Sequence, residues 1–218
     1  MISRGGIVSL LAVSVMLGGV SVAASGPPPV GSSFYAVRPD LRLCPSPLCG
    51  GYWAALANHA RTPCADGALR PRCYVTKVVG EDRHSLPSGV PAGALVRAEI
   101  EPWPFEGFGK LGVLVVADAL APAGRAPEAG SFYRLVDTGI RCVRAPCFSV
   151  RASRLNRSSR TTLSSTDLAA ARAALHELAR AEAALATKNG LLARGHVVPS
   201  PDGGRIFRAT RLYLRSQS

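Results

Sequence analysis

Hydrophobic and polar residues alternate in short runs along most of the chain, and Gly and Pro bound these runs. Such runs, rich in Val and aromatic residues, are typical of β-strands with one buried face. In the first half of the chain the pattern predicts strands at 32–38, 51–57, 73–79, 94–101 and 110–119. In the second half it predicts strands at 131–136, 148–155, 191–198 and 205–214.

One segment of the second half has a helical pattern instead. Residues 164–167, Ser-Ser-Thr-Asp, have the spacing of a capping box, which is typical of a helix N-terminus. The Ala-rich stretch after them places four leucines on one narrow face and stops at Gly190, a residue type that often follows a helix. The leucines are Leu168, Leu175, Leu178 and Leu185. We therefore predict one long helix in this segment.

The chain also resembles itself. A shift of 98 residues superposes Ser-Phe-Tyr at 33–35 on the same tripeptide at 131–133, and it aligns two Cys-x4-Cys units and two asparagines, Asn58 and Asn156. A shift of 97 aligns Arg97 with Arg194. Self-similarity at a fixed distance indicates tandem copies of one folded unit.

These patterns predict an α+β fold of two tandem modules. Each module is expected to be a small antiparallel sheet, with the helix in the second. Because each copy has strands around a variable middle, two OB-like β-barrels are the alternative. The predicted divisions are a signal peptide at 1–24, a disordered lead at 25–30, modules at 31–122 and 130–214, a linker at 123–129, and a tail at 215–218.

The first residues have the pattern of a secretory signal. A short positive segment ending at Arg4 precedes an apolar run at 7–22, and small residues follow up to Ala24. We predict cleavage after Ala24 and a periplasmic or extracellular location. An uncleaved anchor is the alternative, and we expect no transmembrane segment after cleavage.

Six cysteines, an even number in a chain expected to be exported, indicate disulfide bonds. Because a pair present in both copies is most simply closed within each copy, we predict Cys44–Cys49 and Cys142–Cys147, which leaves Cys64 for Cys73. The cysteine spacings do not suit a zinc knuckle, and the four histidines lie far apart in the sequence. We therefore predict no metal site.

The first copy carries a distinctive local sequence. It includes Tyr-Ala-Val-Arg-Pro-Asp-Leu-Arg at 35–42, Cys-Pro-Ser-Pro-Leu-Cys-Gly-Gly-Tyr at 44–52, and Gly-Phe-Gly-Lys-Leu-Gly-Val-Leu at 107–114. These segments resemble an uncharacterised family of exported bacterial proteins catalogued as a domain of unknown function. The second copy follows the pattern only through its cystine loop and the flanking strands. The resemblance implies export and the cystine framework, and it implies no activity, cofactor or catalytic residue.

Charge separates the two copies. The chain has 26 Lys and Arg against 14 Asp and Glu, and residues 130–218 hold 15 of the basic residues but only 5 of the acidic ones. Guanidinium groups on one face could bind phosphate or carboxylate bidentately, so we predict an anionic envelope or extracellular partner. Solvated surface arginines are the alternative. The candidates are Arg151, Arg154, Arg157, Arg160, Arg205, Arg208 and Arg211.

Two further segments are candidate sites. Trp103, Phe105 and Phe108 lie beside three glutamates, which could form a stacking platform, contact the basic copy or cover the core of their own module. The glutamates are only a weak indication of a hydrolase. Arg144 lies in the second cystine loop. If this loop inhibits a protease, Arg144 could enter the specificity pocket of that protease.

No sequence motif of a known catalytic site is present. We identify no catalytic residue and no cofactor, and composition does not predict an oligomeric state. The leading prediction is a disulfide-stabilised, non-catalytic binding module, and the alternative is a protease inhibitor.

Overall fold

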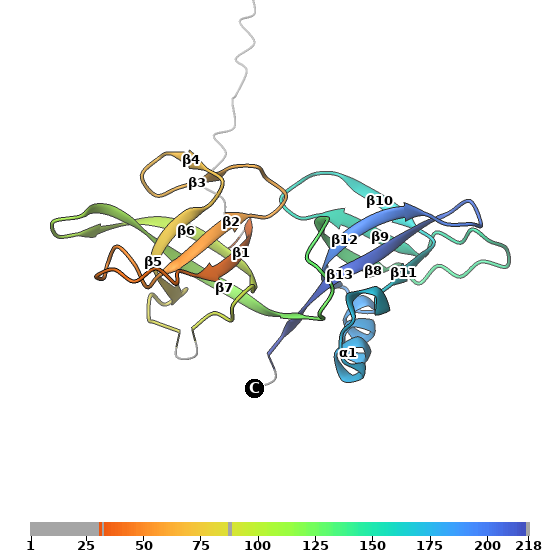
Figure 1. Ribbon diagram of the computed structural model, residues 1–218. Coiled ribbons are helices and arrows are strands. Elements are labelled where there is room, and N and C mark those ends of the chain that lie inside the picture. The colour runs from red at the N-terminus through yellow and green to blue at the C-terminus, as the bar shows by residue number, and fades with distance from the viewer. Residues whose placement is uncertain (1–30, 32, 87–88, 217–218) are drawn as a thin grey trace, which may run out of the picture.

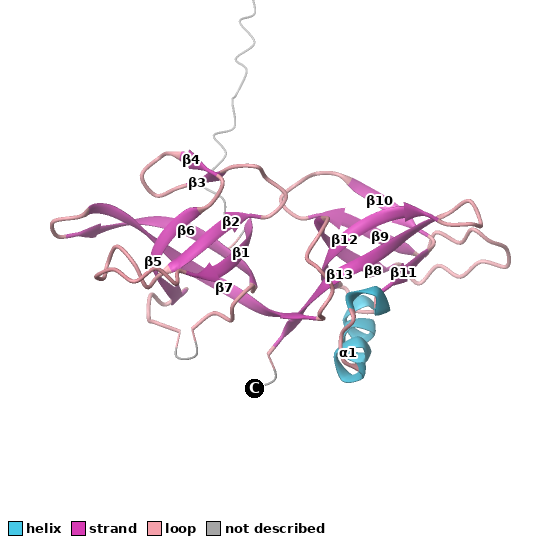
Figure 2. Cartoon of the chain, in the orientation of Figure 1, coloured by secondary structure: helices cyan, strands magenta, loops and turns pink. Residues whose placement is uncertain are grey.

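The computed structural model describes residues 31, 33–86 and 89–216 (Figure 1). The predicted signal peptide and the lead that follows it lie outside the described residues. Strands dominate the fold, and a single α-helix accompanies them in this part of the chain (Figure 2).

Five strands of the first half form a closed barrel, on the left in Figure 1. They are β1 (Ser33–Pro39), β2 (Tyr52–Leu56), β5 (Cys73–Gly80), β6 (Leu95–Phe105) and β7 (Gly109–Ala123). Each strand pairs with the next in the order β1, β2, β5, β7 and β6, and β6 pairs again with β1. Only β5 and β7 run parallel. A two-stranded hairpin, β3 (Thr62–Pro63) and β4 (Leu69–Arg70), lies between β2 and β5 in the sequence.

The second half repeats this order of strands, on the right in Figure 1. Its strands are β8 (Ser131–Asp137), β9 (Val150–Arg154), β10 (Arg160–Leu163), β11 (Ser165–Asp167), β12 (Leu191–Pro199) and β13 (Arg205–Arg215). In place of β5 the second half has two short strands. β10 pairs with β9, and β11 pairs in parallel with β13. Between them, the Ser164 N–H donates to the carbonyl of Arg205 at 2.8 Å.

The expectation of a small antiparallel sheet in each of two tandem modules is met only in part, and the OB-like alternative fits better. The strands form one continuous sheet, because the end of β7 pairs with the end of β13. In the first half the pairing of β6 with β1 closes a ring, and in the second half the segment that forms β10 and β11 runs from β9 to β13. The long strands β6 and β12 are irregular in both halves. A register shift between Arg97 and Ala98 on β6, repeated between Arg194 and Gly195 on β12, bends them at equivalent places.

The helix α1 (Leu175–Leu185) is shorter than predicted, with a 3-10 turn, η1 (Ala169–Ala171), before it. The expected capping-box residues instead form β11, because pairing with β13 satisfies their backbone better than a helix N-terminus would. Leu175 is 86% exposed, whereas Leu178 and Leu185 pack against the core as predicted. The Glu177 side chain accepts a hydrogen bond of 2.8 Å from the Ala174 N–H and so caps the helix.

Each half encloses a core of its own. The first core contains Val37, Val75 and Leu114, all fully buried. The second contains Leu135, Leu163 and Phe207, and α1 packs beside it against β12 and β13.

The two halves meet through a third apolar cluster with matching contributions. The first half supplies Phe34, Ala57, Leu95 and Leu120, and the second supplies Phe132, Leu155, Leu192 and Tyr213. Because Leu95 pairs with Leu120 and Leu192 with Tyr213, the two sets occupy equivalent positions. This is the pattern of a two-fold symmetric interface, formed here within one chain.

Two asparagines cross this interface reciprocally. The Asn58 side chain accepts from the Phe132 N–H at 2.9 Å and donates to the Phe132 carbonyl at 2.8 Å. The Asn156 side chain makes the same two bonds with Phe34, at 2.9 and 2.8 Å. Each copy therefore binds the first strand of the other.

All three predicted disulfide bonds are confirmed. Cys44–Cys49 and Cys142–Cys147 close equivalent loops in the two halves, and Cys64–Cys73 joins the β3–β4 hairpin to the start of β5.

Candidate anion-binding surface

Three of the seven predicted arginines come together on the second barrel. Arg151 on β9, Arg160 on β10 and Arg205 on β13 are exposed and line one shallow hollow of about 410 Å³. Thr161 and Thr162 complete the lining, so it contains no acidic side chain. The Thr161 hydroxyl is buried, whereas Thr162 is exposed. The hollow therefore combines three positive charges with the exposed Thr162 and is suited to an anion.

Strand alternation explains this arrangement. Val150 and Ala152 point into the core, so Arg151 between them points outward. In the register of β9 and β10, Thr162 lies opposite Arg151. Arg205 reaches the same face because β13 begins next to the end of β10.

Arg157 and Arg211 are instead used at the boundary between the halves. The Arg157 guanidinium donates to the carbonyl of Asn58 at 3.0 and 3.2 Å. The Arg211 guanidinium donates to the carbonyl of Ala126 at 3.0 Å, and its side chain is only 16% exposed. Arg157 therefore joins the two copies, and Arg211 binds the connector between them.

Arg154 and Arg208 also have partners within the second barrel. The Arg154 guanidinium donates to the Ser131 hydroxyl at 2.7 Å, and that of Arg208 lies 3.4 Å from the Asp167 carboxylate. These contacts compete with an external ligand for the same groups. Neither pairing was predictable from the sequence, because the partners lie on other strands.

The second cystine loop lines a hollow of its own. Arg144 is exposed in this loop and lines this hollow, of about 300 Å³, together with Ser164, Ser165 and Asp202. The loop connects β8 to β9, and Asp202 belongs to the turn between β12 and β13. In OB-folds the equivalent loops flank the face that binds oligonucleotides or oligosaccharides.

An ion pair fixes the base of this loop. The Arg141 guanidinium contacts the Asp137 carboxylate at 2.8 and 3.0 Å, and the Gly139 N–H donates to the same carboxylate at 2.8 Å. Together these hydrogen bonds lower the pKa of Asp137 to about 2. The loop is therefore anchored by a charged pair as well as by its disulfide.

The first barrel has a different surface at the equivalent place. Trp53 takes the position that corresponds to Arg151, and its ring lies 5.6 Å from that of Tyr74. The guanidinium carbons of Arg42 and Arg72 lie 5.0 and 4.7 Å from the centre of the Trp53 ring. This surface therefore combines aromatic groups with charge.

A buried carboxylate organises that surface, and sequence reasoning did not identify it. Asp40 accepts hydrogen bonds from the Arg42 guanidinium at 2.8 and 3.0 Å and from the Trp53 indole at 3.2 Å. The bonds from Arg42 are the largest cause of the lowered pKa of Asp40. Its only signal in the sequence was its place in the family-like segment at 35–42.

The predicted aromatic loop lies at the end of the first barrel that faces away from the second (Figure 1). Trp103, Phe105 and Phe108 belong to the β6–β7 hairpin, and Trp103 and Phe108 are 37% and 46% exposed. The Lys77 ammonium lies 4.3 Å from the Trp103 ring. The hairpin is thus placed too far away to contact the basic copy.

The three glutamates near this loop occupy different settings. Glu99 and Glu101 belong to β6, whereas Glu106 belongs to the turn that follows. The Glu101 carboxylate pairs with the Arg83 guanidinium at 2.7 Å.

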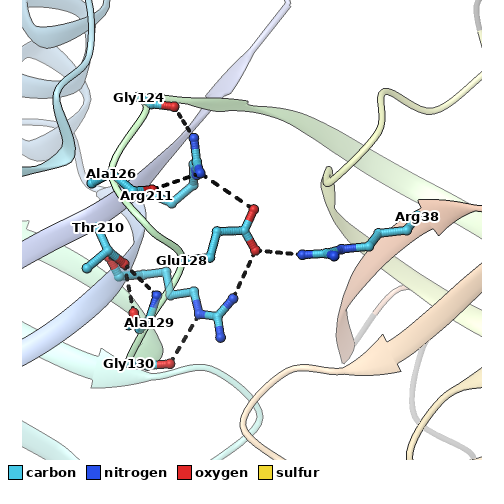
Figure 3. A network of polar contacts seen from close by, with 9 residues as sticks. Arg38, Gly124, Ala126, Glu128, Ala129, Gly130, Thr210 and Arg211 are labelled. Carbon is cyan, nitrogen blue, oxygen red and sulfur yellow. Dashed lines mark hydrogen bonds and ion pairs between the residues drawn. The ribbon is translucent and has the colours of Figure 1, made fainter.

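The connector between the halves carries a second unpredicted carboxylate, shown in Figure 3. The Glu128 carboxylate contacts the guanidinium of Arg38 at 2.8 Å and that of Arg194 at 3.1 Å. Its other oxygen lies 3.7 Å from Arg211. Residues from both barrels and from the connector therefore share one network of charges.

Within the described part of the chain, no group of three or more His, Cys, Asp or Glu is placed to hold a metal ion. No described helix has the length and apolar character needed to cross a membrane.

Comparison with known proteins places the chain by its sequence. A family model described as a domain of unknown function, DUF6748, matches residues 33–218. No curated protein and no solved structure matches the chain.

Proposed function

Given that this chain belongs to the DUF6748 family, we propose that it is a non-catalytic binding protein whose second barrel holds an anionic polymer. The polymer would lie against Arg151, Arg160 and Arg205, with Arg144 of the cystine loop at one end of its path.

The observation that carries this proposal is the shared hollow of three exposed arginines with no acid in its lining. Like charges held close together repel each other, and the repulsion lowers the stability of the folded chain. A polymer of phosphate, sulfate or carboxylate groups relieves that repulsion and gains bidentate hydrogen bonds. A polymer also suits a shallow hollow, because successive charged groups can contact it along its length.

The location we propose is outside the cytosol. Three disulfide bonds suit an oxidising compartment, and residues 1–24 have the composition of a signal peptide. The partners in such a location would be anionic polymers of the cell envelope or of the extracellular space.

The test uses residues 25–218 and a fluorescent heparin oligosaccharide, with affinity measured by anisotropy at several salt concentrations. Replacing Arg151, Arg160 and Arg205 together by Gln should weaken binding by about tenfold or more at low salt. It should also reduce the slope of log affinity against log salt by about two to three, since three charge contacts are removed.

A matched control removes the same charge elsewhere. Arg61, Arg125 and Lys188 are exposed and have no ion pair among the described residues, so their joint replacement by Gln should weaken binding by no more than about threefold. Equal losses in the two variants would mean that net charge alone attracts the polymer. Inhibition of trypsin that disappears in Arg144→Ala, without heparin binding, would favour the inhibitor alternative.

A further inference from the structure

A larger cavity lies where the two barrels meet, on a different part of the molecule from the arginine hollow. Its volume is about 550 Å³, which is within the range of small-molecule sites. Phe34, Leu120, Leu192 and Tyr213, all from the apolar cluster between the halves, form part of its lining. The end of α1 and the residues that follow it close one side.

The lining is strongly basic. It contains Arg97, Arg134, Arg180 and Arg215 with a single carboxylate, Asp118. That carboxylate contacts the Arg215 guanidinium at 2.8 Å, and Arg180 donates to the backbone carbonyl of Arg215.

Arg97 and Arg134 lack an acidic partner among the described residues. Asp118 lies opposite Arg97 in the register of β6 and β7, but its carboxylate pairs with Arg215 instead. Arg134 is half-buried, and its guanidinium carbon lies 5.8 Å from the centre of the Phe34 ring. The cavity therefore has more positive than negative charge in its lining, over an apolar floor.

The other side of the interface shows how a related arginine is neutralised. Arg194 is the counterpart of Arg97, since both precede the equivalent register shifts on β12 and β6. Its guanidinium lies over the Phe132 ring, 5.0 Å from the centre. It also contacts the Glu128 carboxylate at the centre of the network in Figure 3. Of these two counterparts, only Arg194 receives a carboxylate from the connector.

We infer that the cavity between the barrels binds a small organic anion that carries an apolar group. The head group, a carboxylate or a phosphate monoester, contacts Arg97 and Arg134 in the role that Glu128 has toward Arg194 and Arg38. The apolar group packs on Phe34 and its neighbours in the floor. This site is separate from the polymer-binding surface proposed above.

The experiment is calorimetric titration of residues 25–218 at low salt with phenyl phosphate and with phenylacetate. At least one of the two should bind, and the tighter one identifies the head group. Inorganic phosphate and phenol should each bind at least tenfold more weakly than that ligand, because each supplies only half of the contacts. Absence of measurable binding by both organic anions at millimolar concentration would overturn the inference.

Two double variants locate the site. Arg97→Gln with Arg134→Gln should weaken the bound ligand at least tenfold, whereas Arg151→Gln with Arg160→Gln should change its affinity less than twofold. Thermal unfolding of both variants within a few degrees of the wild type would establish that they fold. Folded cavity variants that bind as tightly as the wild type would contradict the inference, and the heparin measurements would stay unaffected by that result.

Discussion

At the scale of single residues, Asn58 and Asn156 each combine a backbone and a side-chain requirement. Both have positive φ, at 63° and 54°, which Asn tolerates better than most residues. Each amide also acts as donor and acceptor toward one residue of the other copy. Asp at either position would lack the donor, and Gly would keep the backbone but lose the bonds. The interface therefore depends on the amide group itself.

Tyr213 gives a residue-scale prediction about alkaline pH. Burial, followed by the negative charge of Glu128, raises the pKa of its hydroxyl from 10.0 to about 12. The folded state keeps the proton that the unfolded state releases, so the stabilisation is full below pH 10 and is lost as the pH rises toward 12. From pH 9 to pH 12 the wild type should lose about 2 to 3 kcal/mol more than Tyr213→Phe in urea unfolding. Parallel losses in the two proteins would contradict this assignment.

At the scale of elements, the alternating pattern located the long strands well. All nine predicted strands are present. At the start of β9, for example, the exposed Arg151 alternates with the buried Val150 and Ala152, as expected for a strand with one buried face. The pattern missed β3, β4, β10 and β11, which are only two to four residues long. It also could not predict ring closure, since this depends on bulges and on which strand edges meet.

The candidate site was predictable only in part for the same reason. Arg151, Arg160 and Arg205 were among the predicted residues, and they share a hollow. Arg211 belonged to the same group, but a connector distant in sequence binds it. A spacing along the chain shows which face a side chain is on, and not which partner reaches it from another element.

The second cystine loop carries the element-scale prediction. Replacing both Cys142 and Cys147 by Ala should lower the free energy of unfolding by about 2 kcal/mol, the loop-entropy value for a ring of this size, as measured by urea denaturation. The double variant Cys64→Ala with Cys73→Ala should lose more, because Cys73 is buried and its removal also costs packing. A larger loss from the exposed loop would contradict this ranking.

At the scale of the whole molecule, the two barrels share a sheet, an apolar cluster and a charge network. Such connections favour a single cooperative unit over two independent domains. The barrel that forms the arginine hollow is therefore held rigidly by a partner that does not contribute to the hollow.

Two natural probes test this cooperativity. Both tryptophans, Trp53 and Trp103, belong to the first barrel, whereas α1 belongs to the second. Phe132→Ala, a cavity-forming change in the shared cluster, should destabilise the chain by about 3 kcal/mol. Tryptophan fluorescence and helical circular dichroism should move together to the same lower urea midpoint. A shift confined to the helical signal would mean that the barrels unfold separately.

The pairing of β7 with β13 has a consequence for the history of the molecule. Leu120 and Tyr213 occupy equivalent positions in the two copies. Leu120 lies opposite Arg215, Ala121 opposite Leu214 and Pro122 opposite Tyr213. The pairing is therefore symmetric about the central pair, Ala121 and Leu214. A lone ancestral barrel with this edge would have been self-complementary, and two identical subunits would have joined through it. After fusion of such a homodimer into one polypeptide, the two halves could have diverged in sequence. In the present chain the two sides of this two-fold axis differ, because Glu128 contacts the arginines on one side whereas four arginines and one carboxylate line the cavity on the other.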